Sequence, residues 1–270
     1  MEKYLVSGKK WKLSSINPDD TGKFKGEAGR AKCEAKTYKL YQRIAELQEL
    51  MFASQSRALL VVFQAMDGSG KDSAIKNIFR DCPASGARVT YFKAPSSLEL
   101  SHNYLWRIQA ALPAKGIIGV FNRSHYEDVL ITRVHQWVSD KQAAKRFIHI
   151  QDFETMLTQE GTSVLKFHFV ISKEEQAIQL QERIDDPTKR WKFNPGDLEE
   201  RKLWDTYMDM YQDAMRHTST KAAPWYAVPG NSRWYRNYII AGVIVEALEA
   251  MKLEYPTPKG EIDWQNLKVV

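Results

Sequence analysis

A lysine in a glycine-containing loop has the clearest chemical role that this sequence suggests. Lys71 ends the run Ala65-Met-Asp-Gly-Ser-Gly-Lys71, which follows a short apolar segment and precedes a helical pattern. Glycines let successive backbone N–H groups point at phosphate oxygens, and the start of the following helix adds its positive dipole end. A strand, a glycine loop, a lysine and a helix in this order form the Walker A arrangement. We therefore predict phosphate contacts from Gly68, Ser69, Gly70, Lys71 and Asp72.

The loop departs from the full Walker A pattern at two positions. Ala65 occupies the place of the first glycine, and Asp72 occupies the place of the Ser or Thr that ligates magnesium. Mg²⁺ prefers one or two carboxylates together with phosphate oxygens and water, so Asp67 inside the loop is the candidate metal ligand. An ordinary strand-to-helix turn, with Asp67 as a turn-forming residue before glycine, is the alternative interpretation.

A second group of polar residues follows another apolar segment, in the run Phe121-Asn-Arg-Ser-His-Tyr-Glu-Asp128. In open α/β sheets, ligands bind beyond the carboxyl ends of the strands. Asn122 stands where P-loop enzymes usually have an acid, and two acids follow about one turn later. Acids that only stabilise the first turn of a helix are the alternative interpretation. We predict functional roles here for Asn122, Arg123, Glu127, Asp128 and Arg133.

The charge of the chain suits an anionic partner. Lysine and arginine total 39 against 33 acids, which gives a net charge of +6. Residues 185–197 form a predicted loop with two prolines, a glycine and a basic centre. Such a loop can close over phosphates and exclude water, although a solvated basic surface is the alternative. The basic residues of this loop are Lys189, Arg190 and Lys192.

Alternation of apolar segments and helical patterns predicts the elements that position these residues. Buried strands are expected at 58–64, 88–92, 116–121, 164–171 and 225–228. Helical stretches are expected from Glu34, and at 96–110, 123–158, 173–185, 197–217 and 232–253. Strands that alternate with helices predict an α/β fold with a parallel sheet sandwiched by helices. Residues 1–33 show no periodicity, so we expect a basic, extended arm before one domain at 34–270.

The composition also predicts the compartment. Two cysteines, Cys33 and Cys82, cannot make a disulfide framework and have no metal-ligand spacing. No apolar run has the length of a signal peptide, and none reaches the roughly 18 residues of a membrane span. No recognition helix or base-stacking pattern predicts a nucleic-acid partner. We expect a cytoplasmic protein without membrane contact.

Taken together, these motifs resemble the family-2 polyphosphate kinases. The similar segments are 66–72, 121–129, 183–197, 223–228 and 233–236, together with Trp204, within a resemblance that runs from the first helix to about residue 255. The resemblance implies a thymidylate-kinase-like P-loop fold, a helical lid around 183–204 and a homo-oligomer, either a dimer or a tetramer. It implies Mg²⁺ or Mn²⁺ at a centre with Asp67 and Lys71, and places Arg123 and Arg183 against phosphates.

The second motif distinguishes classes within that family. Many members of the first class read Asp-Arg-Ser-x-Tyr-Asn-Arg, whereas this chain reads Asn122-Arg-Ser-His-Tyr-Glu-Asp128, which looks like the third class. Third-class enzymes transfer phosphate reversibly from polyphosphate to AMP and ADP, and the resemblance makes Glu127 a candidate metal ligand that selects the nucleotide. An ATP-dependent nucleoside or nucleotide kinase and a non-catalytic P-loop protein that binds nucleic acid remain alternatives. Candidates to bind the rest of the polyphosphate chain are Lys9, Lys10, Lys12, Arg133, Lys189, Lys192, Arg233 and Arg236.

Overall fold

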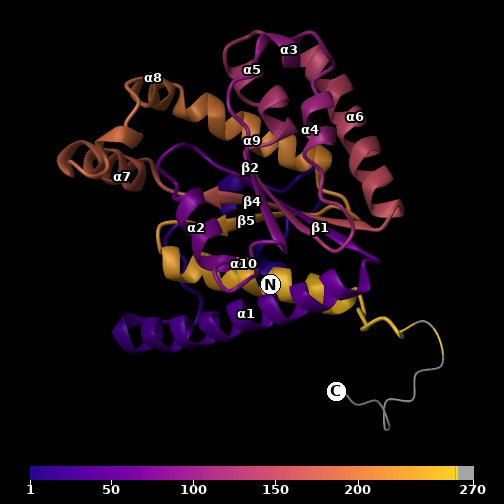
Figure 1. The fold of residues 1–270 in the computed structure, drawn as a ribbon. Helices are drawn as coiled ribbons and strands as arrows, with labels where there is room; N and C mark the ends of the chain where they lie inside the picture. The colour runs from indigo at the N-terminus through magenta and orange to yellow at the C-terminus, as the bar shows by residue number, and fades with distance from the viewer. Residues whose placement is uncertain (259, 261–270) are drawn as a thin grey trace.

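A five-stranded sheet, in which every pairing is parallel, forms the centre of the fold (Figure 1). The computed structural model describes residues 1–258 and 260. The strand order is β2-β3-β1-β4-β5. The strands are β1 (Ala58–Gln64), β2 (Ala87–Tyr91), β3 (Ile118–Asn122), β4 (Thr162–Val170) and β5 (Trp225–Pro229). The parallel sheet that the sequence predicts is therefore confirmed.

Burial on both faces explains the continuous apolar sequence of β1. All seven residues of β1 are buried, as expected for a central strand of a parallel sheet with helices on both sides. Phe63 is the register partner of Asn122 in β3 and of Phe167 in β4. Because β1 and β3 are parallel and in this register, the loop after Gln64 and the segment after Asn122 begin at the same edge of the sheet.

Two long helices cover one face of the sheet, and two others cover the opposite face (Figure 1). The first pair is α1 (Gly26–Ser54) and α10 (Arg233–Ala250), and the second pair is α6 (Asp140–Gln159) and α9 (Trp204–Thr218). The remaining helices are shorter. They are η1 (Glu2–Tyr4), η2 (Leu13–Ser15), α2 (Lys71–Ile78), α3 (Ser97–Leu100), α4 (Trp106–Ala110), η3 (His125–Val129), α5 (Ile131–Val134), α7 (Lys173–Asp185), η4 (Arg190–Lys192) and α8 (Gly196–Lys202). No helix of the described residues is long and apolar enough to cross a membrane.

The N-terminal segment differs from the sequence-based expectation. The first helix begins at Gly26 rather than at Glu34, and its first two turns bury only Cys33, which is why no apolar period marks them. The preceding residues also pack on the domain. Tyr4 and Val6 are buried, and the Val6 N–H donates to the carbonyl of Trp225 at 2.9 Å. The predicted extended arm is thus a packed segment over its first residues and helical over its last.

Three predicted helical stretches are broken. Residues 96–110 contain α3 and α4, and residues 123–158 contain η3, α5 and most of α6; 197–217 is divided near Leu203. Arg123 and Gln136 have left-handed backbone conformations, with φ of 61° and 59°, which interrupt the second stretch. A non-glycine residue with positive φ leaves no clear mark in a sequence, so these breaks were not predictable from it.

A buried ion pair ties η3 to three other elements. The ammonium group of Lys166 in β4 donates to the Glu154 carboxylate in α6, to the Tyr126 hydroxyl at 2.9 Å and to the Thr218 carbonyl at 2.8 Å. Tyr126 in turn donates to Glu154 at 2.8 Å. Burial would raise the pKa of Glu154, but Lys166 and His125 hold it below its ordinary value. The network fixes η3, which carries the second polar motif.

Removing one charge of this pair should strongly destabilise the fold. We expect Lys166→Met to lower the free energy of unfolding by about 3–5 kcal/mol, because it leaves the Glu154 carboxylate buried without its cation. Urea denaturation measures the change. The double variant Lys166→Met with Glu154→Leu should recover most of the loss, since no buried charge remains. A loss of under about 1 kcal/mol in the single variant, as for a surface ion pair, would contradict the interpretation.

Candidate active site

The loop between β1 and α2 curls around the ammonium group of Lys71. The Lys71 side chain is buried, and its Nζ donates to the carbonyls of Ala65 at 2.8 Å and Met66 at 3.3 Å. Gly68 and Gly70 have φ of 85° and 80°, a left-handed conformation that glycine adopts without steric cost. Burial lowers the pKa of Lys71, while Asp67 opposes that effect. The predicted phosphate loop therefore has the curled geometry that the motif requires.

Two side chains from distant helices hold this loop in place. Gln176 of α7 donates to the Asp67 carbonyl at 2.9 Å, and Arg236 of α10 donates to the Ser69 carbonyl at 2.8 Å. A Cβ on Gly68 would lie 3.3 Å from the Gln176 side chain, and one on Gly70 would lie 3.1 Å from Arg236. Arg236 is fully buried behind the loop, so the structure gives it a supporting position rather than one on an open path for polyphosphate.

The Asp67 carboxylate lies between two cations. Its Oδ2 accepts from Arg123 at 2.6 Å, and its Oδ1 lies 3.9 Å from the Lys71 ammonium. Burial would raise the pKa of Asp67, but Lys71 and Arg123 together lower it below the ordinary value. Asp67 is therefore an anion that can ligate a cation once phosphate occupies the two basic groups. Arg123 adopts its left-handed backbone here, and such strained residues cluster at functional sites.

The structure brings most of the predicted phosphate-binding residues to one cavity of about 320 Å³. Asn122 occupies the position of the acid in other P-loop enzymes. Its amide donates to the carboxylate of Asp72, in the first turn of α2, at 2.6 Å. Arg183 reaches the same cavity from α7 and pairs with Asp197 at 3.1 Å. The predicted residues on its wall are Asp67, Gly68, Ser69, Gly70, Lys71, Asp72, Asn122, Arg123 and Arg183.

A second cavity, of about 220 Å³, shares Asp67 and Arg123 with the first. Glu127 lies on its wall, with Tyr207 and Tyr211 of α9. Burial raises the pKa of Glu127, and the nearby charge of Asp67 adds to this, although Arg123 and Lys71 oppose it. Asp67 and Arg123 are thus the residues at which the two cavities meet.

Asp67 and Glu127 form a donor set that fits Mg²⁺. Both are carboxylates on the wall of the second cavity, and Mg²⁺ takes hard oxygen ligands, commonly one or two carboxylates with phosphate oxygens and waters. Within residues 1–258 and 260, no group of three or more metal-ligating side chains occurs. Substrate phosphates and water would therefore have to complete the coordination of an ion held here.

Four residues that the sequence proposed for the site lie elsewhere. Asp128 faces Arg146 at 3.7 Å, and Arg133 is held between Asp140 at 2.8 Å and Asp213 at 2.7 Å. Both positions are outside the two cavities at the phosphate loop. Two lid lysines are also not on these walls. Lys189 pairs with Asp186 at 3.2 Å, and the ammonium of Lys192 lies 4.9 Å from the centre of the Trp191 ring.

Comparison with known proteins agrees with this geometry. A family model for polyphosphate kinase 2 matches residues 27–256. The chain belongs to the polyphosphate kinase 2 family. An AMP/ADP-polyphosphate phosphotransferase of Meiothermus ruber is 47% identical over 260 residues, which cover 96% of this chain and 97% of the relative. An ADP-polyphosphate phosphotransferase of Rhodopseudomonas palustris is 42% identical over 227 residues, which cover 80% of this chain and 78% of the relative.

A solved structure confirms the fold as well. The crystal structure of polyphosphate kinase 2 from Arthrobacter aurescens TC1 matches with a TM-score of 0.92 and 40% sequence identity, over 98% of this chain and 94% of the other. The predicted P-loop kinase-like fold and the resemblance drawn from the motifs are both confirmed.

Several residues of this polyphosphate kinase 2 site were not singled out from the sequence. Gln176 supports the phosphate loop, and Tyr207, Tyr211 and Glu200 line the cavity around Glu127. Tyr207 and Tyr211 are four residues apart on α9, so they share one helix face. That spacing looks like an ordinary core stripe in a sequence, and only the packing of α9 against η3 reveals its place at the site.

Proposed function

We propose that the chain transfers phosphate from polyphosphate to AMP and ADP, giving ADP and ATP in a reversible reaction. The observation that carries the proposal is the meeting of two cavities at Asp67 and Arg123, one built on the phosphate loop and one on Glu127. This arrangement offers separate places for a donor phosphate and an acceptor phosphate. The relative from Meiothermus ruber, named for transfer to both AMP and ADP, supports the choice of acceptors.

The charges at the meeting point suit phosphoryl transfer. Donor phosphate at the phosphate loop would meet the backbone N–H groups and the Lys71 ammonium, while Arg123 and Arg183 reach the same cavity. Catalysis of phosphoryl transfer is mostly positioning and charge stabilisation. Cations around the transferred group would therefore stabilise the negative charge of the transition state. When bound by Asp67 and Glu127, Mg²⁺ would supply further neutralisation of the phosphate charge.

An ion pair joins the two lid elements α7 and α8, and a hydrogen bond joins α8 to α9. Arg183 in α7 pairs with Asp197 in α8, and Glu200 of α8 accepts from the Tyr207 hydroxyl at 2.6 Å. Residues of α7 and α8, among them Gln176, Asp197 and Glu200, line the second cavity. We infer that they close over bound nucleotide and exclude water, which limits hydrolysis of the donor.

The proposed function is tested by incubating the protein with polyphosphate and Mg²⁺, with AMP and ADP supplied in separate reactions, and resolving the nucleotides. We expect ADP and ATP from AMP, and ATP from ADP. A parallel reaction with ATP as the only donor, and a nucleoside or AMP as acceptor, tests the alternative kinase. Transfer from ATP without any transfer from polyphosphate would refute the proposal.

Neutralising the basic lid residues should weaken polyphosphate binding. We expect the triple variant Lys189→Gln, Arg190→Gln and Lys192→Gln to raise the KM for polyphosphate roughly 3- to 150-fold, since three exposed charge contacts of about 0.2–1 kcal/mol each total about 0.6–3 kcal/mol. The salt dependence of that KM should flatten in the same variant. Initial rates at several polyphosphate and salt concentrations measure both effects.

A matched control separates local from general charge effects. Lys115, Lys141 and Lys145 are exposed and lie on neither cavity wall, so changing all three to Gln should leave the KM for polyphosphate unchanged. If the lid variant raised only the KM for nucleotide, the basic loop would instead belong to the acceptor site.

A further inference from the structure

The lid helix α7 contacts the phosphate loop through a buried glutamine. The buried residues of α7 are Gln176 and Leu180, so one of the two is polar. Gln176 is 1% exposed, and its Cγ would lie 3.3 Å from a Cβ built on Gly68. A glycine at that position therefore lets α7 approach the backbone of the loop closely. Because a buried amide needs hydrogen-bond partners, the partners of Gln176 indicate its role.

Both ends of the Gln176 amide are hydrogen-bonded. Its Nε2 donates to the Asp67 carbonyl at 2.9 Å, and its Oε1 accepts from Nη1 of Arg201 in α8 at 2.9 Å. A carbonyl only accepts and a guanidinium only donates, so these two partners fix the orientation of the amide. An ionised glutamate or a methionine has no donor and would not bridge them. A relay of two hydrogen bonds, Arg201–Gln176–Asp67, therefore connects α8 to the phosphate loop.

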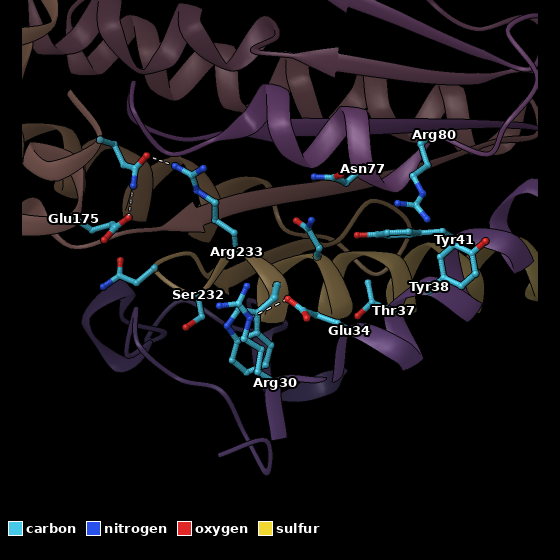
Figure 2. Close-up of a pocket in the computed structure, with 14 residues that line it drawn as sticks. Arg30, Glu34, Thr37, Tyr38, Tyr41, Asn77, Arg80, Glu175, Ser232 and Arg233 are labelled. Carbon is cyan, nitrogen blue, oxygen red and sulfur yellow. Dashed lines mark hydrogen bonds and ion pairs between the residues drawn. The ribbon is translucent and has the colours of Figure 1, made fainter. Parts of the chain in front are cut away.

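A neighbouring glutamine of α7 lies at a different cavity. Gln179 donates to Glu175 at 2.8 Å and accepts from Arg233, and all three line a cavity of about 600 Å³ between α1, α2 and α10. Figure 2 shows Glu175 and Arg233 on this wall. Gln176 lines the second cavity at the phosphate loop instead. The amide that joins the loop to α8 is therefore that of Gln176.

Arg201 lies away from the two cavities at the phosphate loop. Neither wall includes it, whereas its neighbour Glu200 lines the second cavity. The Nη1 of Arg201 also donates to the carbonyl of Lys173, at the start of α7, at 2.5 Å. Arg201 thus holds α8 against α7 and is placed to act on the reaction through Gln176, without contact with a substrate.

The other end of the relay is a residue at which the two cavities meet. The carboxylate of Asp67 accepts from Arg123 at 2.6 Å, while its backbone carbonyl accepts from Gln176. Gly68 follows with φ of 85°, and it has no side chain to restrict its backbone. The hydrogen bond from Gln176 supplies that restraint, and so fixes the peptide unit that carries the Asp67 carboxylate.

We propose that Gln176 and Arg201 are positioning residues, which hold Asp67 for phosphoryl transfer while α8 lies at the second cavity. The proposal deepens the proposed function and rests on it, because the second cavity is taken as the place of the acceptor. Asp197 and Glu200 of α8 line that cavity. A nucleotide that contacts them stabilises α8, and the relay passes this restraint to Asp67. The loop is then ordered for transfer when an acceptor is present.

A double-mutant cycle tests the relay. We expect Arg201→Met to lower kcat for transfer from polyphosphate to ADP about 3- to 10-fold, the effect of one net hydrogen bond, and to leave the KM for polyphosphate unchanged. Gln176→Met should lower kcat at least as far, since it removes both hydrogen bonds. The double variant should be no slower than Gln176→Met, because the contribution of Arg201 is already lost. Losses that multiply would overturn the relay.

Amide hydrogen exchange measures the restraint without turnover. We expect residues 67–70 to exchange several-fold faster in Arg201→Met than in the wild type, although Arg201 lies on α8. AMP added without a donor should slow this exchange more in the wild type than in the variant. Equal protection by AMP in both proteins would overturn the coupling between α8 and Asp67.

The chain offers a matched control for each substitution. Lys202 is the next residue of α8, is exposed and pairs with Glu199 at 2.6 Å, so Lys202→Met removes a charge from the same helix. Gln181 is exposed on α7 and donates to Asp185 at 2.7 Å. Lys202→Met and Gln181→Met should both keep the wild-type kcat and the wild-type exchange of residues 67–70. Thermal melting checks that every variant is folded.

The outcomes separate this proposal from the proposed function. Wild-type protein that transfers no phosphate from polyphosphate would refute the function, and the exchange of residues 67–70 would then decide the relay by itself. An active enzyme in which Arg201→Met keeps the wild-type kcat and exchange would overturn only the relay. A raised KM for ADP with unchanged kcat would also overturn it, because Arg201 would then support acceptor binding and not the position of Asp67.

Discussion

Replacing Lys71 with alanine should lower kcat for transfer from polyphosphate to ADP by about 10²–10³-fold, the typical effect of losing one preorganised charge contact. Lys71 is buried, its ammonium donates to the carbonyls of Ala65 and Met66, and the residue lines the cavity where donor phosphate is proposed to bind. Asp67→Asn should have an effect of similar size, because it removes the anion at which both cavities meet. Initial rates at saturating substrates measure the loss.

A neighbouring lysine provides the control for this prediction. Lys76 lies on the same helix, is exposed and lines neither cavity at the phosphate loop, so Lys76→Ala should keep the wild-type kcat. Thermal melting of all variants checks that Lys71→Ala is folded, since its ammonium also stabilises the loop. A folded Lys71→Ala enzyme with near wild-type kcat would show that the transferred group lies elsewhere.

The strands and the phosphate loop were predictable because their signals are local. The strand β1 has the predicted bounds, Ala58–Gln64, since its continuous apolar sequence reflects burial on both faces. The helix boundaries were less predictable. The helix boundaries between residues 123 and 158 depend on the left-handed conformations of Arg123 and Gln136. Tertiary contacts impose these conformations, and the residue types do not indicate them.

In the candidate site, too, local motifs were predictable and tertiary placement was not. Adjacent acids gave equal signals in the sequence, yet Glu127 lines a cavity at the phosphate loop and Asp128 faces Arg146. The 3₁₀ geometry of η3 explains this, because three residues per turn send neighbouring side chains in directions about 120° apart. Gln176 and Tyr211 reach the site from α7 and α9, so no spacing within one motif could have predicted them.

Exchanging Glu127 for asparagine should reduce transfer to AMP about 100-fold and transfer to ADP by under about tenfold, because the loss of a charge-stabilising group is on that scale. AMP brings only one phosphate group, so an ion held for transfer to AMP would depend more strongly on the carboxylates of Asp67 and Glu127. ADP brings a second phosphate group, whose oxygens can replace part of that coordination. Asparagine keeps a polar side chain but has no charge with which to hold the ion.

Initial rates with AMP and with ADP, at saturating polyphosphate and over a range of pH, test this selectivity. Protonation of Glu127 would remove the charge that holds the ion, so wild-type transfer to AMP should decline on acidification, and the variant should lack this decline. The neighbouring variant Asp128→Asn should keep the AMP-to-ADP rate ratio, because Asp128 lies outside both cavities. An unchanged ratio in Glu127→Asn would refute the selectivity role.

Thermal stability distinguishes this role from a purely structural one. If Glu127 only stabilised the start of η3 through the helix dipole, its replacement would cost about 0.3–1 kcal/mol of stability and lower both rates alike. The raised pKa of Glu127 predicts the opposite change in stability. A carboxyl whose pKa is higher in the folded than in the unfolded state destabilises the fold at pH values above its unfolded pKa, where folding disfavours the charged form. At neutral pH we therefore expect Glu127→Asn to melt at or above the wild-type temperature while its transfer to AMP falls, a combination that loss of a structural contact would not produce.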